Sequence, residues 1–525
     1  MLGTIPVALP ATFTLSAAFE AQRLAHRGAL LTRLTAAHEA AAMDVLCADK
    51  TGTLTRNTLE VAEVAAMPGF DRARVLALAA LASSEAEQDP IDAAIRAAAG
   101  SAERAAPERV VRFVPFDPAT KISQAVAAER DGRAISIVKG AFEIIGKTAA
   151  APADARARVD AIAARGHRVI AVAVGPPGAL QLAGLIAISD PPREDSRPLV
   201  ATLRDLGVRT VMITGDSAVT AGAIAREVGI SGKVCPPERL TEDASVDEFG
   251  VFARIVPEGK YRLVRALQAR GHVVGMCGDG TNDAPALRQA QIGIAVSTAT
   301  DVAKAAAGMV MTEPGLAGIV DAVREGRIGF QRLRTYVFNM LVKKIEVVLF
   351  LAIGLLVTGA AVMTPTLMVL LLITNDFLSM SLTTDRASPA PTPSVWRMRR
   401  ITIAAVVLGL CKLAFSVAML TFAKARLGLA AEQLPTLAFV TLVLGNQAVM
   451  YGLRERRHLW SSKPGNWVLA SSAVDLAIVA GLAGFGILMA PLPWRIIAAL
   501  IAAAAVFALA FDQIKPAVIA AFRAE

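Results

Sequence analysis

The stretch that decides the fold is "MDVLCADKTGTLTRN", Met43 to Asn57, in which a short apolar run ends at Asp49. Two later apolar runs end in a similar way, "VRTVMITGD" at Asp216 and "HVVGMCGDG" just after Asp279. Short apolar strands that alternate with helical segments are typical of a parallel, doubly wound α/β sheet. Ligands bind such sheets at the carboxyl ends of the strands, so we expect these aspartates to share one crevice.

The composition indicates a membrane protein with a soluble catalytic part. The chain of 525 residues is too long for one ordinary domain, and its 54% hydrophobic content is unevenly distributed. Charged residues are frequent from Arg56 to Arg334, whereas long apolar runs with few charges recur from Phe338 onward. The net charge is +9, but only 5% of residues are aromatic, and the basic clusters "WRMRR" and "LRERRHLW" lie between apolar runs. This pattern favours cytoplasmic membrane loops over nucleic-acid binding.

The same contrast divides the chain into consecutive parts. We expect a partial transmembrane segment broken by prolines (1–20), a basic helical connector (21–43), a doubly wound domain (44–57 and 177–325), an inserted α+β domain (58–176) and a transmembrane domain (326–525). The last part holds six apolar runs, each close to the roughly 20 residues that cross a bilayer. The six expected spans are 336–359, 362–383, 402–422, 435–452, 467–489 and 491–512.

Side chains that suit phosphoryl transfer follow the expected strand ends. Carboxylates from these ends would form an oxygen cage that suits Mg²⁺, and a lysine with threonine hydroxyls would suit the oxygens of a phosphoryl group. Asp49 would then be the nucleophile that forms an aspartyl-phosphate. A single aspartate at such a position is usually a helix cap, but the combination favours one shared site. The candidates are Asp49, Thr214, Asp216, Lys260, Asp279, Asn282 and Asp283.

The motifs "DKTGTLT", "MITGD" and "GDGTNDAPAL" resemble those of the P-type ATPases, pumps that phosphorylate themselves on the first aspartate. The stretches "FVPFDPATK", "FQRLRTY" and "SPAPTPSVW" are most similar to the plasma-membrane proton pumps. The resemblance covers essentially the whole chain. It implies a haloacid dehalogenase-like phosphorylation domain with an inserted nucleotide-binding domain. It also implies ATP as substrate, Mg²⁺ as cofactor, and a multi-pass protein of the cell membrane whose catalytic domains are cytoplasmic.

The resemblance also assigns roles to individual residues. It implies that the phosphoryl acceptor is Asp49. The implied catalytic residues are Asp49, Lys50, Thr51, Thr214, Gly215, Asp216, Lys260, Asn282 and Asp283, and the implied metal ligands are Asp49, Thr51, Asp279 and Asp283. The implied nucleotide-binding residues are Asp89, Phe116, Lys139, Gly140 and Asp190. Phe142 stands where the family usually has proline, which changes the detail of the implied adenine pocket.

Ionisable residues inside the expected spans are candidates for transport, because a charge buried in a bilayer is costly. The resemblance implies that Asp376 carries the transported proton, with Asn375 beside it. Glu346 stands where the proton pumps carry an arginine, and Lys343 could supply a positive charge from one turn away. A bundle salt bridge between Lys343 and Glu346 is an equal alternative. The proline motif "PVALP" lacks the glutamate of calcium and sodium pumps, which favours a proton as the cargo.

Pumps of this family also have an actuator domain with a TGE loop, and no such domain precedes Met1 in this sequence. We therefore expect either a fragment of a longer pump or one half of a split pump, whose partner would be the missing N-terminal half. Three other readings are open. They are a P-type ATPase for Mg²⁺, Ca²⁺ or Na⁺, a haloacid dehalogenase-like phosphatase with a membrane anchor, and a non-catalytic remnant.

Overall fold

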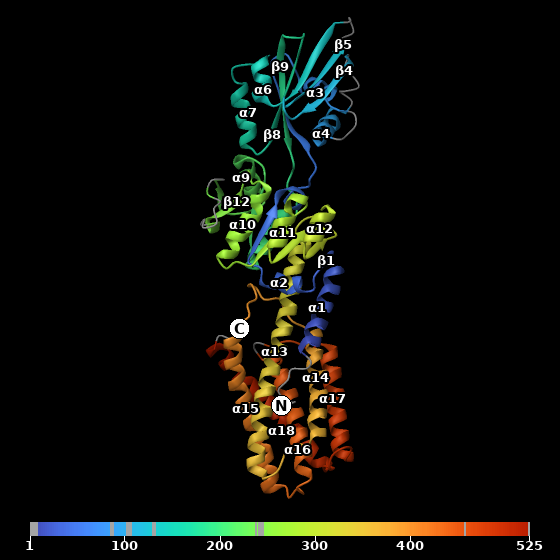
Figure 1. Ribbon diagram of the computed structural model, residues 1–525, viewed down its shortest axis with the longest axis vertical. Helices are drawn as coiled ribbons and strands as arrows, with labels where there is room; N and C mark the ends of the chain where they lie inside the picture. The colour runs from blue at the N-terminus through green and yellow to red at the C-terminus, as the bar shows by residue number, and fades with distance from the viewer. Residues whose placement is uncertain are drawn as a thin grey trace. The chain divides into compact units, whose positions relative to one another are not determined.

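The computed structural model describes residues 9–84, 89–100, 108–128, 133–236, 239, 246–455 and 458–522. The chain divides into two compact units (Figure 1). The α/β unit comprises Gly28–Arg33 and Met43–Val320, and the helical unit comprises Met1–Arg27, Leu34–Ala42 and Asp321–Glu525. The first part of the proline motif, residues 6–8, lies outside the described residues.

The first sheet of the α/β unit has eight strands within the described ranges, in the order β1-β15-β14-β13-β2-β10-β12-β11. Their bounds are Ala29–Leu31 (β1), Val45–Asp49 (β2), Arg209–Ile213 (β10), Lys233–Cys235 (β11), Phe249–Phe252 (β12), Val274–Gly278 (β13), Ile292–Ala295 (β14) and Met309–Met311 (β15). Neighbouring strands are parallel, except that β1 is antiparallel to β15. Every residue of β2 is buried, as a strand covered on both faces requires. Helix α8 (Ser196–Asp205) precedes β10, and the helices that follow β10, β12, β13 and β14 are α9 (Ala218–Glu227), α10 (Pro257–Ala269), α11 (Ala284–Gln289) and α12 (Asp301–Ala306).

The chain order reverses at β2, which lies between β10 on one side and β13 on the other. Asp49 is in register with Ile213, so Thr214 comes directly after the neighbouring strand end. On the other side Ala48 is in register with Cys277, so Asp279 also follows its strand end closely. Such a reversal opens a crevice at the carboxyl ends of the strands. The prediction of a doubly wound sheet with these motifs at one edge is confirmed.

A second sheet, largely antiparallel, forms the rest of the α/β unit. Within the described residues it has the order β3-β9-β8-β6-β5-β4, and β7 pairs with β9. The strands are Glu60–Ala66 (β3), Arg109–Asp117 (β4), Ile122–Ala128 (β5), Ala134–Gly140 (β6), Ala149–Ala150 (β7), Arg168–Gly175 (β8) and Leu180–Ser189 (β9). Apolar side chains of α3 (Arg72–Leu81) and α4 (Pro90–Ala99) pack in one cluster with this sheet, and those of α6 (Phe142–Thr148) and α7 (Ala155–Ala164) pack in another. The predicted inserted α+β domain is therefore present.

Two of the expected segments have other bounds in the structure: the inserted domain and the helical connector. Strand β9 was expected in the doubly wound sheet, but it pairs antiparallel with β8 and β3, so the inserted domain extends past residue 176 to Ser189. The expected helical connector at 21–43 contains the end of α1 (Leu9–Ala25), α2 (Thr35–Ala42) and the edge strand β1. Residues 29–31 form a strand because they pair with β15 at the edge of the first sheet.

The helical unit contains the long helix α13 (Ala317–Thr358) and five helices that are long and apolar enough to cross a membrane, counted over the described residues. These five are α14 (Pro365–Ser381, which a 3-10 turn continues to Thr384), α15 (Met398–Arg426), α16 (Gln433–Arg454), α17 (Asn466–Phe485) and α18 (Trp494–Ala521). The first of the six expected spans is the C-terminal part of α13. It is less apolar than the others because Lys343, Lys344 and Glu346 lie close together in it.

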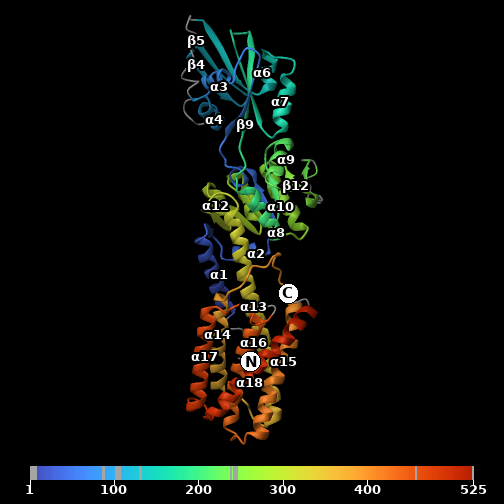
Figure 2. The same ribbon diagram turned by 180° about the vertical axis from the view of Figure 1, so that it is seen from behind.

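The exposure of apolar side chains in the helical unit matches contact with lipid. Helix α16 is the most buried of the five, while α14 and α17 pack against each other and can be followed side by side in both views (Figures 1 and 2). On α17 and α18 large apolar side chains such as Trp467 and Val506 are exposed. Apolar surface of this kind is unfavourable in water and favourable in a bilayer. A multi-pass membrane unit follows from these helices.

Candidate functional site

Three carboxylates meet at the carboxyl end of β2. Oxygens of Asp49, Asp279 and Asp283 all lie within 4.8 Å of one another, the one such group found in the described ranges. Asp283 accepts hydrogen bonds from the backbone N–H groups of Asp279 and Gly280, both at 3.1 Å, which closes the loop after β13. A Cβ on Gly278 would come within 2.7 Å of the Asp283 side chain, so this position requires glycine. The loop sequence thus brings the second and third carboxylates against the first.

Lys260, on α10, is the cation at this cluster. Its Nζ lies 2.5 Å from Asp49 Oδ2 and 2.7 Å from Asp283 Oδ1. Burial lowers the pKa of Lys260, but Asp49 and Asp283 outweigh this effect and hold the pKa above its usual value. Lys260 is therefore charged at neutral pH.

The single charge of Lys260 does not neutralise all three carboxylates. Burial raises the pKa of Asp49, although Lys260 opposes the shift. Burial also raises the pKa of Asp279, and the nearby Asp283 raises it further. One ammonium group against three carboxylates leaves excess negative charge among hard oxygen ligands, and this donor set fits a divalent cation such as Mg²⁺. Asp49, Asp279 and Asp283 are the side chains that could hold it.

The other predicted catalytic residues lie around the same strand ends with different contacts. Thr214 is buried, and its hydroxyl accepts a hydrogen bond of 3.1 Å from the backbone N–H of Asp216. A Cβ on Gly215 would meet open space, so the backbone next to Thr214 can be approached by a ligand. Thr51 has an extended backbone (φ −71°, ψ 131°) in the turn that follows β2. Asn282 is exposed on the loop after β13.

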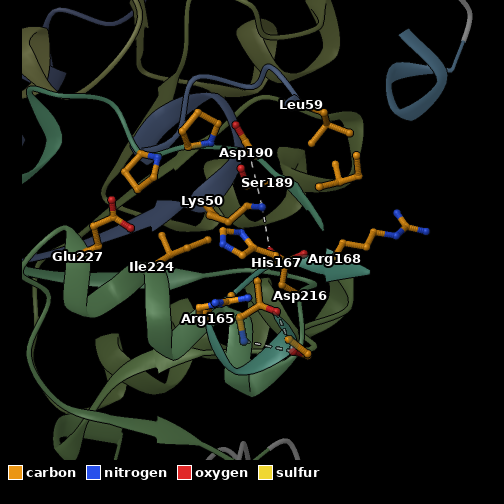
Figure 3. A pocket seen from close by; sticks show the side chains of 17 residues that line it. Lys50, Leu59, Arg165, His167, Arg168, Ser189, Asp190, Asp216, Ile224 and Glu227 are labelled. Atoms are coloured by element: carbon orange, nitrogen blue, oxygen red, sulfur yellow. Dashed lines mark hydrogen bonds and ion pairs between the residues drawn. The ribbon is translucent and has the colours of Figure 1, made fainter. Parts of the chain in front are cut away.

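Lys50 has its ionic partners outside the group of three carboxylates. Its Nζ lies 2.8 Å from Asp216 and 3.9 Å from Asp190 (Figure 3). The Thr55 hydroxyl donates a hydrogen bond of 2.6 Å to Asp190. Lys50 and Asp216 line a cavity of about 550 Å³ together with Asp190. The structure therefore brings these three predicted residues together beside the carboxylate cluster.

Sequence reasoning missed a basic group in this cavity. Arg165, His167 and Arg168 line it, as the labelled side chains in Figure 3 show. They come from "RGHR", which joins α7 to the first residue of β8, and the density of basic residues in this short stretch was the available signal. Arginine pairs readily with phosphate oxygens. The cavity can thus accept an anionic group next to Lys50.

A second cavity, of about 750 Å³, lies in the inserted domain and is lined by four of the five predicted nucleotide-binding residues: Asp89, Phe116, Lys139 and Gly140. Phe116 is 43% exposed, which leaves its ring accessible to a ligand. Arg168 lines this cavity as well as the first one. The fifth predicted residue, Asp190, lines only the first cavity.

Two of the residues in the second cavity have internal partners. Lys139 is buried, pairs with Asp92 and donates a hydrogen bond of 2.6 Å to Ser83. Burial lowers the pKa of Lys139, and Asp92 opposes the shift. Asp89 caps α4, because its carboxylate accepts a hydrogen bond of 2.8 Å from the backbone N–H of Ile91. The cavity wall is therefore held in place by its own polar contacts.

The predicted transport residues pair differently from the expected salt bridge. Lys343 Nζ lies 3.5 Å from Asp376 Oδ1, whereas Glu346 lies 2.7 Å from Nζ of Lys412 on α15. A bridge between Lys343 and Glu346 is thus replaced by two interhelical pairs. Asn375 accepts a hydrogen bond of 2.7 Å from Asn446 on α16. The partner Lys412 was missed because a lone lysine in an apolar span gives no sign of the helix it faces.

Comparison with known proteins agrees with this geometry. The haloacid dehalogenase-like hydrolase family matches residues 43–291, which include β2 and both neighbouring motifs. A protein of Methanocaldococcus jannaschii, provisionally named as a cation-transporting ATPase, is 36% identical over 534 aligned positions. The alignment covers 98% of this chain and 66% of that relative, so the chain spans about two thirds of the relative's length.

Proposed function

We infer from these two matches that the chain belongs to the P-type ATPases, and we propose that it forms the catalytic and C-terminal membrane part of an ATP-driven cation pump. The single observation that carries the proposal is the position of Asp49. It lies at the reversal point of the sheet, within 4.8 Å of two further carboxylates and in contact with Lys260. A buried carboxylate with an adjacent cation and a divalent-cation donor set suits phosphoryl transfer.

In the proposed reaction a carboxylate oxygen of Asp49 attacks the γ-phosphorus of ATP. The new bond is an acyl phosphate, and the bond from phosphorus to the β,γ-bridging oxygen breaks, so that ADP leaves with the electron pair. Lys260 and the Thr214 hydroxyl would stabilise the charge on the transferred oxygens. Bound Mg²⁺ would supply further neutralisation of that charge. Lys50 with Arg168 would hold the phosphate chain, and Phe116 would stack on the adenine in the second cavity.

The test of this step is labelling of the full chain with [γ-³²P]ATP and Mg²⁺. We expect an acid-stable label that hydroxylamine removes, as an acyl phosphate requires, and no label in Asp49→Asn. Asp205→Asn, an exposed aspartate at the end of α8, is the matched control and should label normally. Equal labelling of Asp49→Asn and Asp205→Asn would refute the assignment. A phosphatase with a membrane anchor would instead hydrolyse small phosphoesters at a rate that Phe116→Ala leaves unchanged.

For the cargo we propose a proton carried by Asp376 across a cell membrane. The support is a single, partly accessible carboxylate on α14 with an ammonium group 3.5 Å away, since a metal cation needs several oxygen ligands. The level of phosphoenzyme should then depend on pH and not on added Ca²⁺ or Na⁺, and Asp376→Asn should remove the pH dependence. Asp475→Asn, at another carboxylate in the helical unit, is the control. A phosphoenzyme level that rises with Ca²⁺ or Na⁺ at fixed pH would favour those cations.

A further inference from the structure

A fully buried ion pair joins two helices of the helical unit. Nζ of Lys412 on α15 lies 2.7 Å from Oε2 of Glu346 on α13, and both side chains are 0% exposed. The second carboxylate oxygen, Oε1, accepts a hydrogen bond of 2.6 Å from the Ser416 hydroxyl. Both oxygens of Glu346 thus face groups of the protein itself. Oε2 has the Lys412 ammonium group as its ionic partner and accepts no hydrogen bond, so the ion pair is its only compensation among the described residues.

The charges around this pair have a positive balance. The charged side chains on the facing stretches of α13, α14 and α15, among the described residues, are Lys343, Lys344, Glu346, Asp376 and Lys412. Three ammonium groups face two carboxylates, so the group carries one net positive charge. On α16 the neighbours are amides, and Gln447 donates a hydrogen bond of 2.7 Å to Asp475 of α17. Asp475 therefore has its own partner and does not alter the balance at Glu346.

We propose that Lys412 is an internal counter-ion that occupies the position of a metal cation beside Glu346, and that it excludes metal cations from the membrane unit. The proposal rests on the proposed function and deepens it. Metal cations such as Ca²⁺ need several oxygen ligands and a negatively charged site. Lys412 occupies an oxygen of Glu346 and neutralises its charge, so neither requirement is met. Glu346 is then a partner of Lys412 and not a ligand of the cargo. Lys412 is a specificity-determining residue that sequence reasoning did not identify.

The experiment measures thermal unfolding of the full chain in detergent, at saturating Mg²⁺, with and without added Ca²⁺, Na⁺ or K⁺. The wild type and Lys412→Arg should have melting temperatures that none of the three cations changes. Lys412→Met should melt several degrees lower, because it leaves Glu346 buried without a partner, and Ca²⁺ should restore part of the loss. The variant Lys412→Met with Glu346→Gln removes both charges. It should regain most of the wild-type melting temperature and show no response to Ca²⁺.

Several results would overturn the proposal. One is a Ca²⁺, Na⁺ or K⁺ stabilisation of the wild type that disappears in the double variant, since a metal cation would then bind at Glu346 despite Lys412. Another is a Lys412→Met variant that melts and responds to Ca²⁺ like the wild type. If Lys412→Met does not fold, the double variant decides: recovery of folding supports the pairing, and no recovery refutes it. Labelling of Asp49 by ATP is measured in a separate assay. A failure of the proposed function can therefore be distinguished from a failure of this inference.

Discussion

Removal of the Lys260 charge is the sharpest test of the carboxylate cluster. Lys260 is 12% exposed and pairs with Asp49 at 2.5 Å and with Asp283 at 2.7 Å. Lys260→Met leaves two buried carboxylates without their cation, and loss of one partner from a buried pair costs about 3–5 kcal/mol. Lys233→Met is the matched control. Lys233 pairs with Glu248 at 3.1 Å, but the lysine side chain is 76% exposed, so this loss should cost less than about 1 kcal/mol.

The assay is urea unfolding of the full chain in detergent, followed by circular dichroism in EDTA and again in Mg²⁺. In EDTA we expect Lys260→Met to lose about 3–5 kcal/mol relative to the wild type. In Mg²⁺ the deficit should shrink, because the cation binds the folded cluster and replaces part of the missing positive charge. The reasoning fails if the two lysine variants lose the same stability in EDTA, or if Mg²⁺ stabilises Lys260→Met less than it stabilises the wild type.

Three further predictions concern the cavity of the inserted domain and the pH dependence of the cluster. Lys139→Met should lower the melting temperature because it leaves Asp92 buried without its cation, and adding Asp92→Asn should restore most of the loss; no recovery in the double variant would contradict the pairing. Gly140→Ala should cost about 1–3 kcal/mol in urea unfolding, because its Cβ would lie 2.3 Å from the carbonyl oxygen of Lys121, and an unchanged midpoint would disprove the close approach. Burial raises the pKa of Asp279, so this carboxyl binds a proton more tightly in the folded chain than in the unfolded chain. In EDTA the melting temperature of the wild type minus that of Asp279→Asn should therefore increase as the pH falls from about 7 to about 5. A difference that stays constant or decreases would refute the raised pKa of Asp279.

The carboxylate cluster was predictable from sequence because residues that follow neighbouring strands of a parallel sheet meet at one edge of it. Asp49 and Asp279 each follow an apolar strand, and the ends of neighbouring parallel strands meet at one edge. Strand β9 was assigned to the wrong sheet because its sequence does not indicate which strands it pairs with. Its run "LAGLIAI" holds no polar side chain, and a continuous apolar run fits a buried strand in either sheet. Only its antiparallel pairing with β8 and β3 identifies the second sheet.

Side-chain partners across the helical unit were less predictable than the helices themselves. Hydrophobicity indicates which segments can span a bilayer, but it does not give the rotation of each helix about its axis. Lys343 and Glu346 lie three residues apart on one helix, which made a bridge between them a reasonable expectation. The structure turns them toward different neighbours, Asp376 on α14 and Lys412 on α15. Helix rotation therefore decides which carboxylate remains accessible.

The charge balance differs in sign between the two sites, and this difference bears on which cation is cargo and which is cofactor. At the strand ends of the α/β unit, three carboxylates face one buried lysine, counted over the described residues, so a divalent cation would complete the site. In the helical unit, the group counted around Glu346 and Asp376 within the described residues has three lysines, Lys343, Lys344 and Lys412, against two carboxylates, so a further cation is repelled there. A pump for Mg²⁺ or Ca²⁺ would need the negative balance in its membrane unit, where several oxygens must replace the hydration shell. The proposed proton cargo would need one accessible carboxylate, and of the two carboxylates in this group Glu346 is held by Lys412, which leaves Asp376 for the proposed role.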